Sequence, residues 1–344
     1  QFTNEGFELR LEAVQAEIGA WQGAYGGQIR IRDFGAFNLE DGGAAFIPPS
    51  TTEQYGIYTF QEYNEGPLHL EGALRYERTD VENDFLDINR DFDAFSVSAG
   101  GGYDVTEELT LTGNVFRTQR APSAEELFSD GAHLATAQFE IGDVDLNLEK
   151  SIGGEVSLKY NGERISITLN AFYTDFDDYI FQQETGEIIE GLTEVNFTGS
   201  DVEFRGFEAQ GNVNLTQFNG FSIDADALVE VVRADGDDVG NLPRIPPLGG
   251  LVGISAKSDY LSLRAELDWA TEQDNTATFE LPTDGFTQVN LFASYNAEFA
   301  GQDVTFRVSA LNLFDTEARQ HTSFLKDILS LPGRNFKFSL STAF

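Results

Sequence analysis

Two regularities restrict the fold of this chain most: side chains alternate with a period of two, and the connections between the alternating segments are sorted by length. Alternation is clearest from Arg164 to Thr174, where Ile165 and Ile167 are separated by Ser166. A period of two is that of a β-strand with one apolar and one polar face. Fifteen such segments are predicted, at residues 6–18, 20–32, 54–64, 67–80, 92–104, 108–118, 146–160, 163–176, 202–215, 219–233, 248–258, 260–271, 286–299, 302–314 and 333–344. The chain is therefore predicted to be all-β.

The connections alternate between short and long. Short turns are predicted around Gly19, 64–66, 106–107, 161–163, 218–220, 258–259 and 300–301. Long loops are predicted at residues 33–53, 81–91, 119–145, 177–201, 234–247, 272–285 and 315–332. Short periplasmic turns on one rim and long extracellular loops on the other are typical of a transmembrane antiparallel β-barrel. A Greek-key sandwich has no reason to sort its connections in this way.

Composition agrees with a membrane barrel and excludes several other classes of protein. The chain has 30 Phe, 11 Tyr and 34 Gly but only 9 Pro, which suits strands and tight turns. It contains no apolar run of the roughly 18 to 20 residues that a membrane-spanning helix needs. The net charge of −37 argues against nucleic-acid binding, which requires a basic face. It favours cations, or ligands that carry them, as partners, although acidic loops that are simply well hydrated explain the charge equally.

The number of predicted strands is odd, whereas bacterial single-chain barrels have even numbers because both termini lie on the periplasmic side. The last strand ends at the rim of short turns, so residue 1 is expected at the rim of long loops. We therefore expect residues 1–344 to form one partial outer-membrane β-barrel domain, the C-terminal part of a larger barrel. An intact barrel of 14 to 16 strands is the alternative.

The closing strand is the best example of the two faces. Phe336, Phe338, Leu340 and Phe344 fall on one side of it, and polar residues such as Lys337 fall on the other. In a membrane barrel the aromatic side faces lipid and the polar side faces the lumen. A terminal Phe344 also suits an aromatic anchor at the membrane interface.

Several motifs resemble a known family when they are taken in order. The long loop reads Arg120-Ala-Pro-Ser-Ala-Glu125-Glu126-Leu-Phe-Ser-Asp-Gly-Ala-His133, and the last loop reads His321-Thr-Ser-Phe-Leu-Lys326-Asp327 before Leu331-Pro-Gly-Arg-Asn335. Together with the closing strand these motifs resemble the C-terminal barrel of TonB-dependent outer-membrane receptors, in the branch of zinc-type and haem-type receptors. The resemblance covers essentially the whole chain.

The resemblance implies a barrel of 22 strands, of which this chain would supply the last fifteen, filled by an N-terminal plug domain that has no counterpart in this sequence. It implies a place in the bacterial outer membrane, with outer-membrane lipid and lipopolysaccharide, the TonB complex acting through the plug, and the barrel-assembly machinery as partners. The machinery would recognise the closing strand through Phe336, Phe338, Leu340 and Phe344.

The function that this family implies is TonB-dependent uptake of a scarce nutrient, a metal ion or metal chelate such as zinc, an iron–siderophore complex or haem. Two alternatives remain from the residues alone: a passive porin-like channel of 14 to 16 strands, and a structural barrel that binds a partner at its surface. An enzyme is not expected, because the chain has no Cys, only 3 His and no nucleophile-elbow sequence.

Candidate ligand-binding residues lie in the long loops: Arg120, Glu125, Glu126, His133, His321 and Lys326. Imidazole is a common metal ligand, so His133 and His321 are the candidates for a metal or haem contact at the extracellular mouth. Hydrogen bonding within the loops is the alternative role for both. No intrinsic cofactor is expected beyond the transported metal or chelate.

Acidic runs in the loops could hold calcium through oxygen ligands, although none follows the EF-hand pattern and hydrated loops are the alternative. These runs are Asp84 to Asp93, Asp175 to Asp178 and Asp235 to Asp238. A set of arginines near lumen faces is expected to form ion pairs with acidic neighbours: Arg120, Arg205, Arg233, Arg264, Arg307 and Arg334.

Overall fold

The computed structural model describes residues 1–37, 46–299 and 301–342. In these ranges there are eighteen strands and one short helix. Three short strands lie within connections: β7 (Asp130–His133), β8 (Gln138–Ile141) and β13 (Gly240–Asn241). The other fifteen form the wall: β1 (Phe2–Ile18), β2 (Trp21–Ala36), β3 (Ser50–Glu65), β4 (Leu68–Asn83), β5 (Ile88–Asp104), β6 (Leu109–Arg120), β9 (Glu149–Asn161), β10 (Ile165–Ile189), β11 (Leu192–Phe218), β12 (Phe221–Gly236), β14 (Gly249–Lys257), β15 (Leu261–Ala270), β16 (Phe286–Phe299), β17 (Gln302–Leu311) and β18 (Asn335–Thr342). The all-β prediction is confirmed, and each of the fifteen predicted segments overlaps one wall strand.

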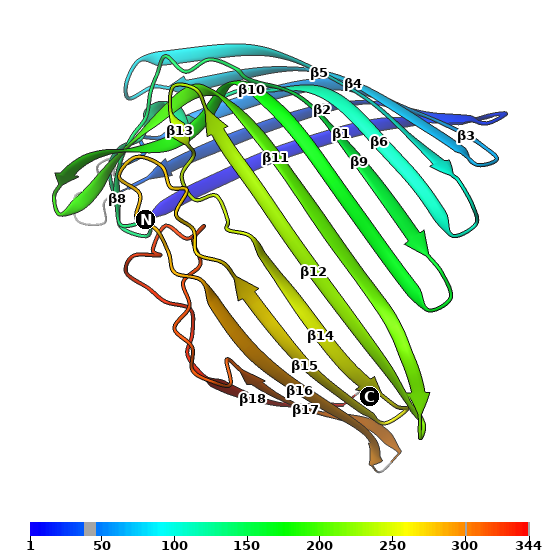
Figure 1. Ribbon diagram of the computed structural model, residues 1–344. Coiled ribbons are helices and arrows are strands. Elements are labelled where there is room, and N and C mark those ends of the chain that lie inside the picture. The colour runs from blue at the N-terminus through cyan, green and yellow to red at the C-terminus, as the bar shows by residue number, and fades with distance from the viewer. Residues whose placement is uncertain (38–45, 300, 343–344) are drawn as a thin grey trace.

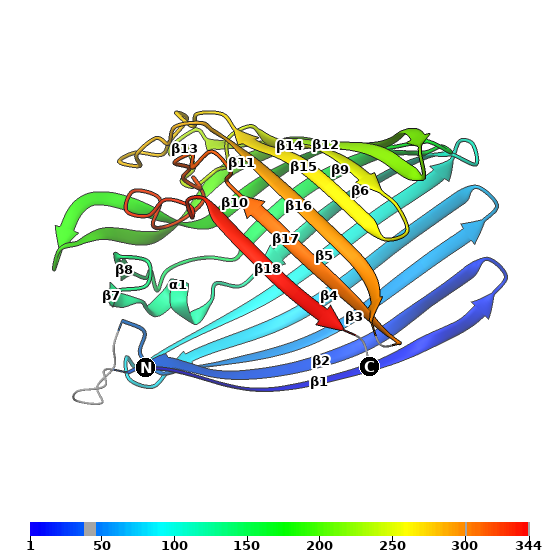
Figure 2. The same ribbon diagram turned by 90° about the horizontal axis from the view of Figure 1, so that it is seen from below.

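The wall is an antiparallel meander. Each wall strand pairs with the next one along the chain, with β6 pairing directly with β9 and β12 with β14. The sheet curves into a barrel wall (Figure 1), and the view from below shows its concave side (Figure 2). Among the described residues, β1 pairs only with β2 and β18 only with β17, so the wall is not closed.

The two faces of the wall differ in chemistry. Ile254, Ala265, Leu291, Ala310 and Phe336 are in register across five neighbouring strands and form one apolar row on the convex face. In the closing strand Phe336, Phe338 and Leu340 are 57%, 76% and 65% exposed, which agrees with the predicted apolar side, while Phe344 lies outside the described residues. Exposed apolar rows of this kind suit contact with lipid. The concave face, which we call the lumen face, carries the polar set.

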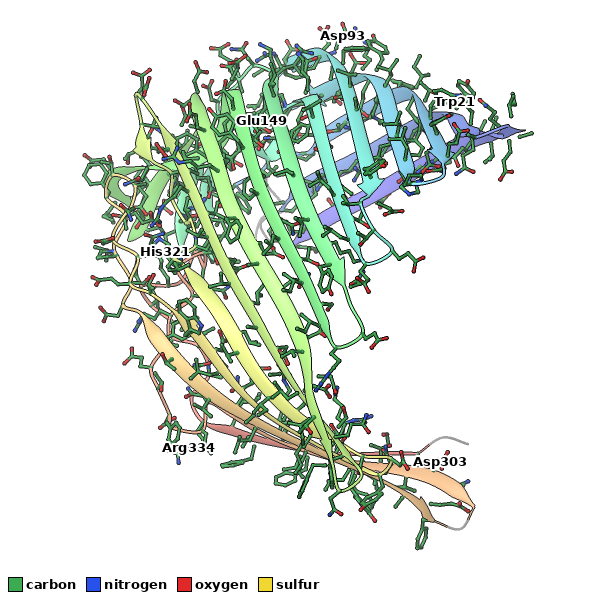
Figure 3. The ribbon with its side chains drawn as sticks, turned by 45° about the vertical axis from the view of Figure 1, so that its right-hand side comes forward. Trp21, Asp93, Glu149, Asp303, His321 and Arg334 are labelled. Carbon is green, nitrogen blue, oxygen red and sulfur yellow. The ribbon has the colours of Figure 1, made fainter. Side chains whose placement is uncertain are left out.

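One end of the wall, which we call the short-turn rim, joins its strands by tight turns. Asn219 and Gly220 connect β11 to β12 with φ of 49° and 83°, the backbone of a type I′ hairpin turn. Trp21 and Asp303 mark this rim in Figure 3, whereas His321 lies among the loops at the opposite end. We call that opposite end the long-loop rim. The predicted sorting is confirmed for five of the seven connections at this rim: β2–β3, β6–β9, β12–β14, β15–β16 and β17–β18.

Two of the predicted long loops are wrong. Residues 81–91 mostly continue β4 and β5 around the turn at 84–87, and residues 177–201 form the ends of β10 and β11 around Glu190 and Gly191. Acidic residues interrupt the apolar pattern of these segments, and the sequence therefore predicts loops there. Backbone pairing needs no apolar face in water, so the strands extend past the point where alternation stops.

The long connection between β6 and β9 folds against the lumen face. Its only helix, α1 (Ala124–Phe128), begins with a capping box between Ser123 and Glu126. Leu127 and Phe128 are buried in a cluster with Val81 and Ile180. No helix in the described ranges is long and apolar enough to cross a membrane.

Candidate functional site at the long-loop rim

Three long connections meet at one buried carboxylate, Glu280. Its Oε1 accepts a hydrogen bond from the backbone N–H of Arg244 at 2.9 Å, and its Oε2 accepts one from Ala277 at 3.0 Å. His321 Nε2 lies 3.2 Å and Lys326 Nζ 3.7 Å from Glu280 Oε1. The connections 237–248, 271–285 and 312–334 are thus joined at a single side chain. We call Glu280, His321, Lys326 and Arg244 the Glu280 cluster.

Three side chains of the Glu280 cluster are buried. The side chains of Glu280, His321 and Lys326 are 3%, 1% and 5% exposed. His321 Nδ1 is 2.9 Å from the Thr283 hydroxyl. His321 Nε2 lies beside the Glu280 carboxylate, but its geometry is not that of a hydrogen bond. Burial alone would raise the pKa of Glu280, but the contact with His321 and the two backbone N–H groups lower it below its ordinary value. Glu280 is therefore held as a carboxylate.

Arg244 supplies a second cation at the same place. Burial lowers the pKa of its guanidinium, although nearby Glu280 opposes the shift. The guanidinium carbon is 4.3 Å from the centre of the Phe324 ring, and Nη2 donates to Gln182 Oε1 at 3.5 Å. Arg244 adopts a left-handed φ of 60°, which costs free energy for a residue with a Cβ. The loop packing around Glu280 holds this conformation.

His133 has a separate set of partners. Its Nδ1 is 2.7 Å from Glu140 Oε1, which also accepts from the Thr136 hydroxyl at 3.2 Å. The Phe46 ring stacks on the imidazole with centroids 4.4 Å apart. The β7–β8 hairpin that carries His133 also pairs with β11 through β8, in parallel. His133 thus stabilises the β7–β8 hairpin and packs it against Phe46.

Arg120, Glu125 and Glu126 connect helix α1 to the wall. Arg120 donates to Glu126 Oε2 at 2.8 Å and to Glu149 Oε2 at 2.9 Å. Arg32 Nη2 donates to Glu125 Oε1 at 2.9 Å. These contacts orient the connection between β6 and β9 over the lumen.

The structure thus brings some of the predicted site residues together and separates others. His321 and Lys326 share Glu280, and Arg120 contacts Glu126, whereas the polar partners of His133 differ from those of His321. In the part of the chain that the structure describes, no group of three or more His, Cys, Asp or Glu side chains could hold a metal ion. Metal contact by His133 and His321, and calcium in the acidic loops, therefore stay predictions.

Sequence reasoning missed Glu280 and Arg244. Glu280 is one carboxylate among 58 acidic residues, and nothing around it in sequence distinguishes it. The one usable signal is that Glu280 stands two residues before Pro282 in a predicted loop, which is too general to identify a buried group.

Comparisons with known proteins agree on the family. A family model described as TonB dependent receptor-like, beta-barrel matches residues 2–313. TonB-dependent heme receptor A of Haemophilus influenzae is 23% identical over 308 residues, which is 79% of this chain and 40% of that protein. The chain therefore spans less than half the length of this curated relative.

Two solved structures share the fold. The copper transporter OprC superposes with a TM-score of 0.80 at 18% identity, covering 98% of this chain and 56% of that one. The ferric citrate transporter FecA in its unliganded form gives 0.71 at 18% identity, covering 99% and 54%. The family model matches most of the sequence, and the antiparallel meander is the barrel wall that the resemblance implied. This chain belongs to the TonB-dependent receptor β-barrel family.

Proposed function

We propose that the chain forms the barrel wall of an outer-membrane transporter that takes up a metal ion or a metal chelate with energy supplied through TonB. The observation that carries this proposal is the match of the family model to residues 2–313. The names of the relatives point to haem, copper and ferric citrate as kinds of cargo. Zinc, which the sequence left open, has no support among these relatives.

The long-loop rim suits capture of cargo from outside the cell. Its connections are tied to one another at Glu280 and to the wall through Arg120, so the rim is a defined surface and not a set of independent loops. Ordered loops lose less conformational entropy when a ligand binds. In this proposal the loops capture the chelate and the lumen face guides it inward.

The remaining partners follow from the same proposal. The exposed apolar rows would contact outer-membrane lipid and lipopolysaccharide, and the closing strand would be read by the barrel-assembly machinery. The TonB complex would act on parts of the protein other than this wall. No catalytic step is assigned to any residue of the chain.

Uptake by cells that express the full-length protein tests the proposal. Accumulation of radiolabelled iron supplied as haem or as ferric citrate should be saturable, and it should be lost when TonB is absent. Accumulation that continues without TonB would contradict the proposal. Steady ion conductance of the full-length protein in a planar bilayer would instead favour the porin-like channel.

A further inference from the structure

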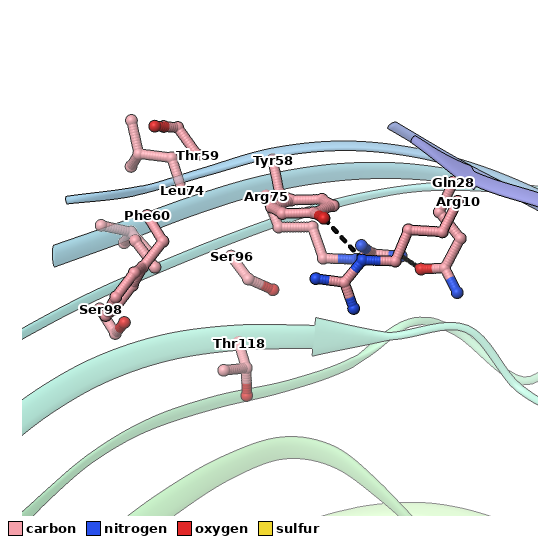
Figure 4. Close-up of a pocket in the computed structure, with 12 residues that line it drawn as sticks. Arg10, Gln28, Tyr58, Thr59, Phe60, Leu74, Arg75, Ser96, Ser98 and Thr118 are labelled. Carbon is pink, nitrogen blue, oxygen red and sulfur yellow. Dashed lines mark hydrogen bonds between the residues drawn. The ribbon is translucent and has the colours of Figure 1, made fainter. Parts of the chain in front are cut away.

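A hollow of about 480 Å³ lies on the convex face of the wall, across β1, β2, β3 and β4. Tyr58 and Arg75 line a recess on the lumen side of β3 and β4 (Figure 4). Side chains one position along a strand point to the opposite face, so Ile57 and Tyr76 point outward from the same two strands. Ile57, which lines the hollow, is 65% exposed. The hollow therefore opens on the face that suits contact with lipid.

The end of the hollow nearer the short-turn rim is apolar. Four residues are in register there across the four strands: Leu11, Gly27, Ile57 and Tyr76. A Cβ on Gly27 would meet only the backbone oxygen of Gly56, at 3.7 Å, so the glycine leaves open space between the side chains of its neighbours. This space has room for a flexible hydrocarbon chain.

The end of the hollow nearer the long-loop rim is acidic. Arg78, which lines it, lies 2.9 Å from Asp80, 3.3 Å from Asp91 and 3.5 Å from Asp93. One guanidinium thus faces three carboxylates, and the group keeps a negative charge. The side chains of Asp91 and Asp93 are 63% and 53% exposed, so a cation from outside can reach both.

The surrounding groups leave this charge in place. The Tyr76 hydroxyl donates to Asp93 at 2.6 Å, and the Tyr55 hydroxyl donates to a further carboxylate, Glu53, at 2.8 Å. Arg117 of β6 donates to a backbone oxygen of β5 at 3.2 Å. Tyrosines with an apolar ring and a polar tip are typical of the boundary between the hydrocarbon and the headgroups of a membrane. The acidic end of the hollow is therefore at the level of the lipid headgroups.

We propose that this hollow binds a lipid whose headgroup carries a primary amine, with an acyl chain over Gly27 and the ammonium group beside Asp91 and Asp93. A primary ammonium group presents N–H donors that carboxylates accept. An anionic headgroup without an amine would instead be repelled by the negative charge around Arg78. The inference rests on the proposed function, because it requires the convex face to lie in the membrane, and it adds the class of lipid that one part of this face selects.

A single introduced cysteine reports on the hollow, because the chain contains no Cys. Phe95→Cys on β5 is in register with Tyr76 at the edge of the hollow. Ile254→Cys on β14 is the control, in a second convex-face hollow of about 610 Å³ whose described lining residues include no carboxylate. Phe95 and Ile254 are 47% and 49% exposed, so the two labels are matched in exposure.

Each cysteine variant of the full-length protein carries a bimane label in phosphatidylcholine vesicles, with EDTA present to remove divalent cations. The vesicles contain a small fraction of phosphatidylethanolamine or of phosphatidylglycerol that carries a nitroxide near the top of one acyl chain. A nitroxide quenches the fluorescence of a label only when it is nearby. We expect the ethanolamine lipid to quench the β5 label about twofold more than the glycerol lipid, the size of one exposed ion pair. Both lipids should quench the β14 label equally.

The carboxylates are then neutralised. Adding Asp91→Asn and Asp93→Asn should remove the preference of the β5 label for the ethanolamine lipid. Glu203→Gln with Asp235→Asn is the matched control, because these two exposed carboxylates lie 3.6 and 3.0 Å from Arg205 on the same convex face. With that control pair the preference should persist.

Three results overturn the inference. The first is a preference for the ethanolamine lipid that survives the loss of both aspartates. The second is an equal preference at the β14 label, which would reflect the lipid around the whole barrel and not this hollow. The third is quenching of the β5 label by the glycerol lipid that equals or exceeds quenching by the ethanolamine lipid.

The same labels separate this inference from the proposed function. If neither lipid quenches either label, the convex face does not lie in lipid, and the proposed membrane wall fails together with the inference. If both lipids quench the β5 label equally in a protein whose uptake depends on TonB, only the inference is wrong and the proposed function stands.

Discussion

Two charged groupings in this molecule are similar in chemistry but differ in origin. On the wall, Arg264 of β15 pairs with Asp226 of β12 at 2.5 Å and with Glu266 at 3.0 Å. At the long-loop rim, Glu280 joins His321, Lys326 and the backbone of Arg244. Strand register alone places the first group, whereas three loops that are distant in sequence must meet to form the second.

This difference shows in the burial of the groups. Arg264 is 28% exposed on the open lumen face, where water solvates and screens its charge. Glu280 is 3% exposed, and losing one partner would leave the other charges buried without compensation. The wall should therefore tolerate polar changes on its lumen face, and the long-loop rim should not.

The largest expected effect is a charge on the convex face of the wall. Ile167→Lys together with Leu263→Arg places two cations at exposed apolar positions. Each position is the third residue of its strand from the short-turn rim, below the depth of greatest cost, so the two together should cost about 3 kcal/mol. We expect little folded protein in urea refolding experiments followed by heat-modifiable gel mobility. Thr168→Lys and Ser262→Arg, one residue away on the lumen face, should fold almost normally. Equal loss on both faces would contradict the assignment of the faces.

This contrast also explains what could be predicted from the sequence. The strands, their faces and the sorted rims follow from a period of two and from turn residues, which are local signals. The ends of β10 and β11 did not follow, because pairing continues beyond the alternating segment. The sequence places Arg120 and Lys326 in loops. Arg120 instead ends β6 and is paired in register with Glu149 of β9, 29 positions away, across a connection whose length hid the pairing. Glu280 lies 46 positions from Lys326, and only the folded loops bring these two together.

The next largest effect is expected at Glu280. Glu280→Gln removes the buried carboxylate beside Lys326, whose ammonium then has only the exposed Asp327 at 3.8 Å, and should cost about 2 kcal/mol of loop docking. Hydrogen exchange should speed up in 237–248, 271–285 and 312–334 and stay unchanged in the wall strands. Asp327→Asn is the control, because Asp327 is 43% exposed beside the same lysine and its loss should matter little. Faster exchange across the wall strands as well would show that the rim and the wall are one cooperative unit.

Acid should reproduce part of that change. The pKa of Glu280 in the folded rim lies below its ordinary value of 4.5, so its stabilising contribution is complete above that value and is lost as the pH falls through the lower folded pKa. The protection of the three connections from hydrogen exchange should stay constant from pH 7 to about 5.5 and decline below about 4.5. The decline should be no larger than the loss of protection that Glu280→Gln causes at neutral pH. Other carboxylates titrate in the same range, so Glu280→Gln provides the baseline. A decline of the same size in that variant would show that Glu280 is not its source.

The smallest effect is expected at the short-turn rim, where structure is local. Asn219 holds a φ of 49° in the turn between β11 and β12, a conformation that asparagine tolerates better than most residues. Asn219→Ala should lower the free energy of unfolding in urea by about 1 kcal/mol, because the left-handed conformation is less favourable for alanine than for asparagine. Asn219→Gly should be neutral or slightly stabilising. Hydrogen exchange in the loops around Glu280 should not respond to either change, since the two rims are separated by the full length of β11 and β12. A response there would mean that a turn at one rim controls loop docking at the other.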